Sequence, residues 1–320
     1  MFYNAFNKNI MKQVTNNILM IRPVNFRYNK QTAVNNYYQK VLNYASNDLV
    51  QKKALLEFNY FVRKLQKFGV NVMVIDDKIS PDTPDSIFPN NWVSFHADGS
   101  VVVFPMYAKN RRDERRRDIF KLLEIKYGFL INSIRDFTQL EHEEKYLEGT
   151  GSMVLDRKNK ICYAAISVRT NKIAVMSFCN EFNYKPVLFK AYQNIKDERV
   201  LIYHTNVMMC VADNFVIICL DSIDNKNERD HVIDSIVNSG KKIIEITEEQ
   251  KHRFAGNMLQ VMGDKTYIVM STSAFNSLTE DQKKNIQNYN EIIHSSLDTI
   301  EACGGGSARC MMAEVFLPKK

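Results

Sequence analysis

A cysteine behind a run of glycines is the first candidate for chemistry in this 320-residue sequence. Cys310 ends the segment Gly-Gly-Gly-Ser-Ala-Arg-Cys, which begins at Gly304. Glycines let a backbone approach a ligand closely, and the neighbouring cation of Arg309 favours the thiolate, the nucleophilic form of cysteine. We predict Cys310 as a nucleophile and Arg309 as part of the substrate-binding set. A buried structural cysteine is the alternative, and Cys303 is the rival nucleophile.

His204 and Glu148 are the predicted partners of this thiol. A neutral imidazole near neutral pH can shuttle protons for a thiol attack and for the hydrolysis that follows. A carboxylate such as Glu148 can hold an NH group of the substrate. Taken alone, His204 could be a strand-end histidine and Glu148 a turn or capping carboxylate. Their positions within an internal repeat favour the catalytic interpretation.

Three asparagines occupy similar positions and complete the expected site. Asn91 ends Phe-Pro-Asn-Asn, Asn206 ends His-Thr-Asn, and Asn257 ends Phe-Ala-Gly-Asn. Each segment lies just before an apolar run that reads as a strand. We predict these amides as substrate-binding groups, because an amide can both donate and accept a hydrogen bond.

The elements that must bring these residues together form a repeat. Pairs of apolar runs around short polar turns, the pattern of β-hairpins, recur with a period of about 50 to 60 residues. The expected hairpins are 92–95 with 101–104, 153–155 with 161–166, 207–211 with 215–220, and 258–262 with 266–270. A fifth starts at 311–317, and residues 18–21 can supply its second strand.

Helical patterns and third strands follow each hairpin. The expected pairs are 112–127 with 129–134, 168–184 with 187–190, 224–239 with 241–246, 279–296 with 297–302, and 45–68 with 70–75. One unit cannot bury its own apolar face, so such repeats stack into propellers or solenoids. We predict an α/β fold, a five-bladed propeller of ββαβ units, as a single catalytic domain over residues 18–320. Residues 1–17 are expected to be a loose N-terminal extension, and residues 25–38 are a candidate lid.

Composition excludes several classes of protein. Hydrophobic residues make up 45% and charged residues 25%, as in folded globular proteins. Neither a membrane span nor a signal sequence is evident, so we expect a cytoplasmic protein. The cysteines lack the close pairing of a zinc site, and four of them are expected to be buried as small apolar residues: Cys162, Cys179, Cys210 and Cys219. The basic cluster 111–117 contains interleaved acids, which favour a solvated helical face over a nucleic-acid patch.

The segments quoted above resemble the guanidine-modifying, or pentein, superfamily, a group of α/β propellers that includes arginine deiminases, amidinotransferases and dimethylarginine hydrolases. The resemblance covers residues from about 18 to 318. It implies the nucleophile at Cys310, the acid/base at His204 and the substrate-holding carboxylate at Glu148. The stretch Ser-Val-Arg-Thr-Asn is similar to one in the dimethylarginine hydrolases. That similarity implies that Arg169 grips the substrate's α-carboxylate, with a surface arginine as the alternative.

The sequence departs from an arginine deiminase where acids are expected. Asn91 and Asn206 stand in place of aspartates, and Gly151 in place of the acid that ends a Glu-Gly-Gly-Asp pattern. A buried guanidinium needs counter-charges, whereas amides suit a neutral ureido group. The motif set is most similar to the amidinotransferase-related citrulline hydrolases.

The expected reaction is therefore hydrolysis of citrulline to ornithine, ammonia and carbon dioxide through a covalent intermediate on Cys310. We expect no metal or cofactor, a small amino acid as the only partner apart from a possible homodimer, and neither nucleic acid nor membrane. The alternatives are an arginine deiminase, a dimethylarginine hydrolase or an amidinotransferase, and, from another class, a non-catalytic propeller that binds an amino acid.

Overall fold

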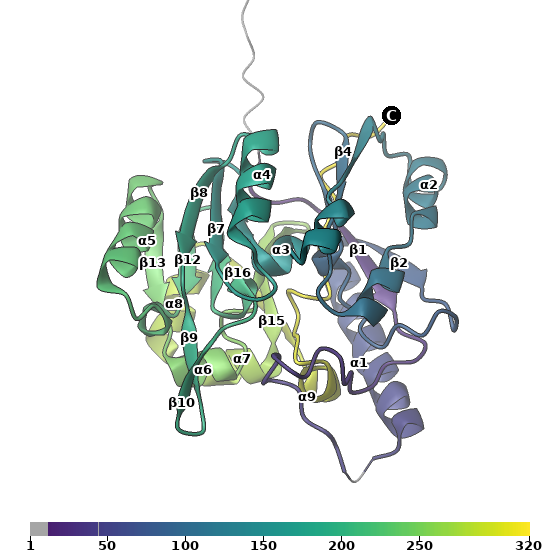
Figure 1. The fold of residues 1–320 in the computed structure, drawn as a ribbon, viewed down its shortest axis with the longest axis horizontal. Coiled ribbons are helices and arrows are strands. Elements are labelled where there is room, and N and C mark those ends of the chain that lie inside the picture. Colours follow the sequence, from purple (N-terminus) through teal and green to yellow (C-terminus); the bar gives the residue numbers. More distant parts are fainter. Residues whose placement is uncertain (1–11, 44) are drawn as a thin grey trace, which may run out of the picture.

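Small three-stranded sheets of one design form the framework of the protein (Figure 1). The structure, a computed structural model, describes residues 12–43 and 45–320. Within these residues five sheets each contain an antiparallel pair, and a third strand runs parallel to the middle one. A helical segment joins the two parallel strands in every case. The predicted ββαβ unit is confirmed.

The strands of the five sheets, in spatial order, are as follows. They are β17 (Ala313–Glu314), β1 (Asn17–Arg22) and β2 (Asn71–Asp76); β3 (Val93–Phe95), β4 (Ser100–Val103) and β5 (Ser133–Asp136); β6 (Val154–Asp156), β7 (Ile161–Ala165) and β8 (Lys185–Phe189); β11 (Met209–Val211), β12 (Phe215–Ile218) and β13 (Lys242–Glu245); and β14 (Leu259–Met262), β15 (Thr266–Ser271) and β16 (Glu291–Ser295).

The connecting helices include α1 (Asn47–Lys67), α2 (Asp118–Ile125), α4 (Lys172–Phe182), α5 (Lys226–Asn238), α6 (Glu248–His252), α7 (Thr272–Ser277), α8 (Glu280–Gln287) and α9 (Asp298–Gly304). The Ser46 side chain caps α1 by accepting a hydrogen bond from the backbone of Leu49. Ala54, Phe58 and Leu65 share the buried face of α1, as the helical period requires. Among the described residues no helix is both long and apolar enough to cross a bilayer.

The first and last strands of the chain meet in one sheet. Strand β1 pairs antiparallel with β17 and parallel with β2, as predicted for residues 18–21. Isolated pairing also joins Phe95 to Val315, and it links this sheet to the next one. The sheets stay separate and do not merge into a closed barrel within the described residues.

The fourth unit differs from the prediction. The predicted helix 279–296 ends at Gln287, the third strand is β16 at 291–295, and the predicted strand 297–302 is largely helix α9. A capping box at Thr279 starts α8, and the run Glu-Ile-Ile-His-Ser then pairs with β15. The apolar residues at 292–293 were misplaced because a short apolar run fits helix and strand periods equally well. A hairpin of β9 (Tyr192–Ile195) and β10 (Glu198–Leu201) was not predicted.

Residues 12–17 are not loose, contrary to the predicted extension, whose residues 1–11 lie outside the described part. Gln13 is buried, and its Nε2 donates to the carbonyls of Leu155 (3.0 Å) and Val211 (3.2 Å). Its Oε1 accepts from the backbone N–H of Arg157 at 2.7 Å. This one side chain therefore ties two different sheets together.

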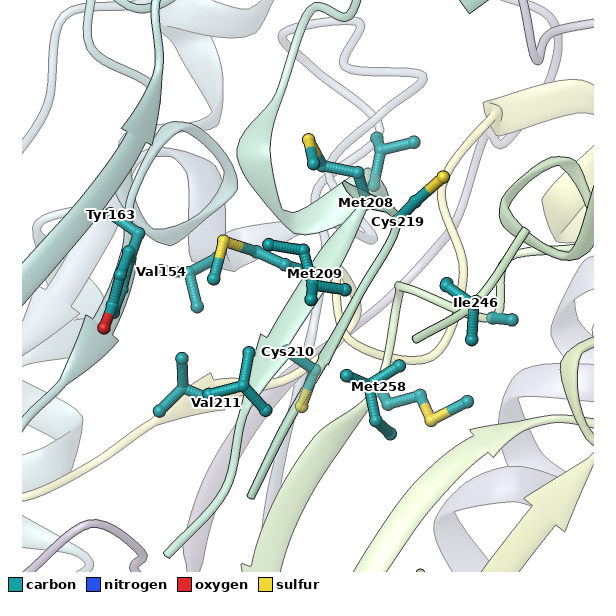
Figure 2. Packing of buried hydrophobic residues seen from close by; sticks show 14 of the residues in the cluster. Val154, Tyr163, Met208, Met209, Cys210, Val211, Cys219, Ile246 and Met258 are labelled. Atoms are coloured by element: carbon teal, nitrogen blue, oxygen red, sulfur yellow. The ribbon is translucent and has the colours of Figure 1, made fainter. Parts of the chain in front are cut away.

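Apolar side chains between neighbouring sheets form the core. Figure 2 shows part of one cluster, in which Met208, Met209 and Cys210 of the third unit pack with Met258 of the fourth. All six cysteines are free and buried, which confirms the prediction for Cys162, Cys179, Cys210 and Cys219. The core thus holds the turns at the sheet ends in fixed positions.

Candidate active site

Short turns at the starts of the sheets carry the predicted site residues. The 3₁₀ turn η1 (Pro89–Asn91) precedes β3, α3 (Gly149–Ser152) precedes β6, and η4 (Thr205–Val207) precedes β11. Asn257 likewise precedes β14, and Cys310 precedes β17. Turn α3 contacts both η1 and η4, so residues far apart in sequence come together.

One small cavity contains both the predicted nucleophile and the predicted base. Its lining comprises Thr32, Asn36, Asp85, Phe88, Asn91, Arg111, Arg169, Tyr203, His204, Gly304, Gly305, Gly306 and Cys310. The cavity measures about 10 Å³, space for about one water molecule. A larger cavity of about 620 Å³, lined by Thr15, Asp98 and Phe316 among others, contains none of the predicted site residues.

Two carboxamides hold the sulfur of Cys310. Asn257 Nδ2 lies 3.2 Å and Asn206 Nδ2 lies 3.4 Å from the Sγ atom. Asn257 also bonds the backbone around the site, because its Nδ2 donates to the Asn206 carbonyl at 2.9 Å and its Oδ1 accepts from the Arg309 N–H at 3.1 Å. Hydrogen-bond donors aimed at sulfur favour the thiolate over the thiol. Neutral amides therefore take the place that the sequence assigned to a cation.

His204 is held by Glu148. Its Nε2 lies 2.7 Å from Glu148 Oε2, and both side chains are buried. Burial lowers the pKa of His204 to about 4, although Glu148 acts in the opposite direction. The imidazole is therefore neutral at pH 7. An ionised carboxylate only accepts hydrogen bonds, so Nε2 carries the proton and Nδ1 keeps a free lone pair.

Glu148 lies behind His204 and does not line the cavity. Its Oε1 accepts from the Tyr107 N–H at 3.0 Å, and Oε2 lies 3.5 Å from Arg169 Nη1 and 3.9 Å from Arg111 Nη1. Burial alone would raise the pKa of Glu148, but Arg169, His204 and Arg111 hold it well below its usual range. This carboxylate orients the imidazole, and its expected contact with a substrate NH group stays a prediction.

Arg169 reaches the cavity, as the resemblance implied, and is almost fully buried. Its Nη2 donates to the Thr32 carbonyl at 2.7 Å, and its Nε donates to Asn35 Oδ1 at 2.8 Å. Tyr203 packs against the guanidinium, 4.9 Å from ring centroid to Cζ. Residues of the segment 25–38 thus accept the hydrogen bonds of Arg169 and cover the cavity.

Sequence reasoning missed Arg111 and Asp85. Arg111 was placed on a solvated helical face, but it is 2% exposed and lines the cavity. Glu114, from the same basic cluster, pairs with it in the interior. Asp85 accepts from Asn29 and Thr32, while its Oδ1 has no partner. Burial raises the pKa of Asp85 against the pull of Arg111. No signal in an alternating charge run distinguishes one buried arginine from its exposed neighbours.

The Arg309 side chain does not reach this cavity, unlike the predicted arrangement. Its Nη1 donates to the Met312 carbonyl at 2.9 Å, and its Nη2 pairs with Glu314 at 3.1 Å. Arg309 and Cys310 lie in the turn 308–311, where neighbouring side chains point in different directions, so adjacency to Cys310 in sequence does not bring the guanidinium to the sulfur. Only the backbone N–H of Arg309 supports the site.

A glycine makes room between the base and the first asparagine. A Cβ atom on Gly151 would lie 2.4 Å from Asn91 Nδ2 and 2.8 Å from His204 Nδ1. Any side chain at this position would clash with the amide of Asn91 or the imidazole of His204. Over residues 12–43 and 45–320 no group of three or more His, Cys, Asp or Glu side chains is arranged to hold a metal ion.

Comparisons with known proteins place this geometry in context. The family model described as N,N-dimethylarginine dimethylhydrolase, eukaryotic, matches residues 22–317. A search of curated proteins gives no match.

Solved structures share the fold at low sequence identity. Apo ArgZ, an arginine dihydrolase from the ornithine–ammonia cycle in cyanobacteria, has a TM-score of 0.71 at 18% identity, covering 95% of this chain and 41% of ArgZ. The chain therefore spans about two fifths of that protein. The N-terminal domain of ArgZ bound to substrate covers 94% of this chain and 99% of the domain, with a TM-score of 0.70 at 18% identity. A dimethylarginine dimethylaminohydrolase variant in an adduct with S-methyl-L-thiocitrulline has a TM-score of 0.59 at 14% identity. The match covers 93% of this chain and 98% of that one.

Proposed function

The chain belongs to the eukaryotic N,N-dimethylarginine dimethylhydrolase family, within the guanidine-modifying superfamily, and from this premise we propose that it hydrolyses the ureido carbon of citrulline. It is a cysteine-dependent hydrolase of non-peptide C–N bonds. The substrate is our own assignment, and it rests on what surrounds Cys310.

Carboxamides surround the sulfur, and this observation carries the proposal. Asn206 and Asn257 contact Sγ directly, and Asn91 lines the same cavity. The nearby carboxylate of Glu148 is already bonded at both oxygens, by Tyr107 and His204. A guanidinium beside Cys310 would therefore find no free counter-charge among Asn91, Asn206, Asn257 and Glu148, and an uncompensated buried cation is costly. A neutral ureido group carries no such cost.

Other polar groups that line the cavity suit an α-amino acid. Arg169 offers a guanidinium group for a carboxylate, and the unpartnered Oδ1 of Asp85 can accept from an α-ammonium group. The segment 25–38 must move to admit such a molecule, because the closed cavity has room for about one water. We retain this segment as the proposed lid.

The proposed reaction has two stages. As Nδ1 of His204 takes the proton of the Cys310 thiol, the sulfur attacks the ureido carbon and forms a C–S bond. The C–N bond to the ornithine nitrogen then breaks as that nitrogen takes this proton from His204. The carbamoyl group remains on sulfur. Nδ1 of His204 then takes a proton from water, whose oxygen attacks the same carbon. Cleavage of the C–S bond releases carbamic acid, which decomposes to ammonia and carbon dioxide, and the proton on His204 returns to the sulfur of Cys310.

A second candidate, a hydrolase of arginine or methylated arginine, is supported by the family match. Incubation of the purified protein with citrulline, arginine and dimethylarginine separately, with assay of ornithine, citrulline and ammonia, distinguishes the two. We expect ornithine from citrulline as the fastest reaction. Arginine or dimethylarginine as the faster substrate would overturn the assignment.

Mass spectrometry of the acid-quenched enzyme tests the intermediate. A carbamoyl adduct is expected on Cys310 in the wild-type protein and in Cys303→Ala, the matched control for the rival thiol, which is also buried. Cys310→Ala is expected to lose both the adduct and turnover. Turnover by Cys310→Ala at the wild-type rate would exclude this nucleophile, and ligand binding by the wild type without turnover would favour a binding protein.

We also propose that the five sheets are the blades of a propeller around the cavity. Contacts between β3 and β17, β6 and β11, and β11 and β14 support this arrangement. It accounts for five turns from five units at one site.

A further inference from the structure

Hydrogen bonds to Glu114 fix the guanidinium of Arg111, so that its Nη1 atom faces Asn91. Its Nε and Nη2 donate to the two oxygens of Glu114, each at 2.9 Å. Nη2 also points to the carbonyls of Phe88 (3.4 Å) and Asp85 (3.5 Å). The remaining nitrogen, Nη1, donates to Asn91 Oδ1 at 2.9 Å. A guanidinium has donors only, so the atom of Asn91 that faces Arg111 must be the oxygen.

The orientation of the Asn91 amide follows from this bond. With Oδ1 held by Arg111, the NH₂ group points the other way, and Nδ2 is buried without a hydrogen-bond partner. Nδ2 and His204 Nδ1 both pack against Gly151, and Asn91 and His204 both line the cavity that contains Cys310. A buried polar group without a partner is uncommon in folded proteins. An unsatisfied donor beside the catalytic imidazole therefore indicates a ligand atom that accepts.

We propose that Arg111 sets the substrate specificity of the enzyme, because by holding Asn91 Oδ1 it makes this position a hydrogen-bond donor that matches a ureido oxygen and opposes a guanidinium nitrogen. The inference rests on the proposed function and names the contact that selects the substrate. A ureido group presents a carbonyl oxygen, which becomes an oxyanion during thiol attack and gains from a fixed donor. A guanidinium presents N–H groups on all sides, so one of them would face Nδ2 as donor against donor.

An aspartate at residue 91 would replace the hydrogen-bond donor with an acceptor. Asn91→Asp keeps the shape and the bond to Arg111, but it presents an acceptor in place of the donor. Discrimination through a polar group left unpaired is typically large. We expect the ratio of kcat/KM for citrulline to that for arginine to fall by about 10- to 100-fold in Asn91→Asp.

Asn90→Asp is the matched control. Asn90 is the neighbouring buried asparagine, and its Nδ2 points to Thr150 Oγ1 at 3.4 Å instead of to the cavity. The same chemical change there should leave the citrulline-to-arginine ratio at the wild-type value, even if the amount of folded enzyme falls. Arg111→Lys is a second variant, in which the two-pronged bond to Glu114 is lost and the amide can flip. We expect the ratio of kcat/KM for citrulline to that for arginine to move toward one in this variant.

The experiment measures this ratio for the wild type and the three variants, with a thermal unfolding midpoint for each. A wild-type ratio retained by folded Asn91→Asp, or an equal shift in Asn90→Asp, would overturn the inference while leaving the proposed function intact. Faster arginine than citrulline hydrolysis by the wild type would instead overturn the proposed function. If turnover is absent, calorimetric binding of both amino acids to Cys310→Ser supplies the same ratio, and binding of neither would overturn both.

Discussion

Two amide groups, instead of a cation, contact the reactive sulfur at 310. An amide dipole stabilises a thiolate less than a full charge does, so the protein needs both of them in position. The donor Nδ2 of Asn257 is itself fixed by a second bond to the backbone of Asn206. The reactivity of the thiol therefore depends on uncharged groups that do not titrate.

Removal of either amide should make Cys310 less reactive at neutral pH. Because a hydrogen bond to a charged group contributes about 1.5–3 kcal/mol, the rate of alkylation of this thiol by iodoacetamide at pH 7 should fall by about 10-fold or more in Asn206→Ala and Asn257→Ala. The Cys303→Ala background removes the rival thiol from the signal. An unchanged alkylation rate in both variants would show that the amides do not activate the sulfur.

The neutral state of His204 predicts an unusual pH profile. Because burial lowers the pKa of this imidazole to about 4, Nδ1 remains an available base well below pH 6.5. We expect kcat/KM to stay nearly constant from pH 7 down to about 5 and to fall only near pH 4. An acid limb at pH 6 to 7 would mean that a solvated imidazole is the base.

For single residues, the sequence indicates which side chains are chemically unusual, but it does not indicate where a side chain points. Cys310 and His204 could be found because a thiol after glycines and an imidazole at the equivalent repeat position are unusual scaffold residues. Arg111 could not be found, because its burial depends on tertiary contacts with Glu114 and Asn91. Arg309 was misassigned because sequence adjacency does not fix where a side chain points.

At the level of elements, helix α9 prepares the loop that carries the nucleophile. Glu301 on this helix accepts from Ser307 Oγ at 2.5 Å, and the Ser307 carbonyl accepts from the Cys310 N–H at 3.0 Å. Gly305, with a φ of +62°, turns the chain between them. The buried carboxyl of Glu301 therefore fixes the loop through its hydrogen bond with Ser307.

Glu301→Gln should change how stability depends on pH. Burial raises the pKa of Glu301 from 4.5 to about 7, with Ser271 and Ser307 opposing the shift. A raised pKa means that this contribution is fully present below pH 4.5 and is lost as pH rises toward 7. The free energy of unfolding of the wild type relative to Glu301→Gln should fall by on the order of 3 kcal/mol between pH 4.5 and 8.

Urea unfolding at the two pH values measures this difference, and Glu280→Gln is the control. Glu280 is also helical, but its side chain is 90% exposed, so its replacement should change the free energy of unfolding little at either pH. A constant difference for Glu301→Gln as well would mean that the buried carboxyl does not titrate in this range.

Most elements could be predicted from period and turn residues, because hairpins around Asp-Gly and Gly-Asp turns are strong local signals. The exceptions are instructive. Strand β16 was absorbed into a helix because Thr279 starts a helical pattern that contains no glycine or proline before residue 291. The hairpin of β9 and β10 was missed because its strands are polar and carry little apolar alternation.

For the whole molecule, the buried amide of Gln13 joins two successive units to a segment that is distant from both in sequence. It bonds Leu155 and Arg157 of one sheet and Val211 of the next. Removal of this side chain would leave its backbone partners without these hydrogen bonds. The predicted loose extension therefore contains a structural tie.

Gln13→Ala should lower the free energy of unfolding by about 2–4 kcal/mol, since each buried group left unsatisfied costs about 1–3 kcal/mol. Chemical denaturation of purified protein measures the change. Lys12→Ala is the control, because Lys12 is exposed and its loss should change stability by less than about 0.5 kcal/mol. Equal stability of the two variants would show that the tie contributes nothing.

The pairing of β1 with β17 has a consequence for how the protein is made. Thr15 Oγ1 bonds the Val315 carbonyl across 300 residues of chain, so this sheet must wait until nearly all of that sequence has left the ribosome. Closing so long a loop is entropically demanding and slow. The residues that flank the reactive thiol are therefore among the last to find their neighbours, and an unfinished nascent chain has no assembled pocket with which to act on free amino acids.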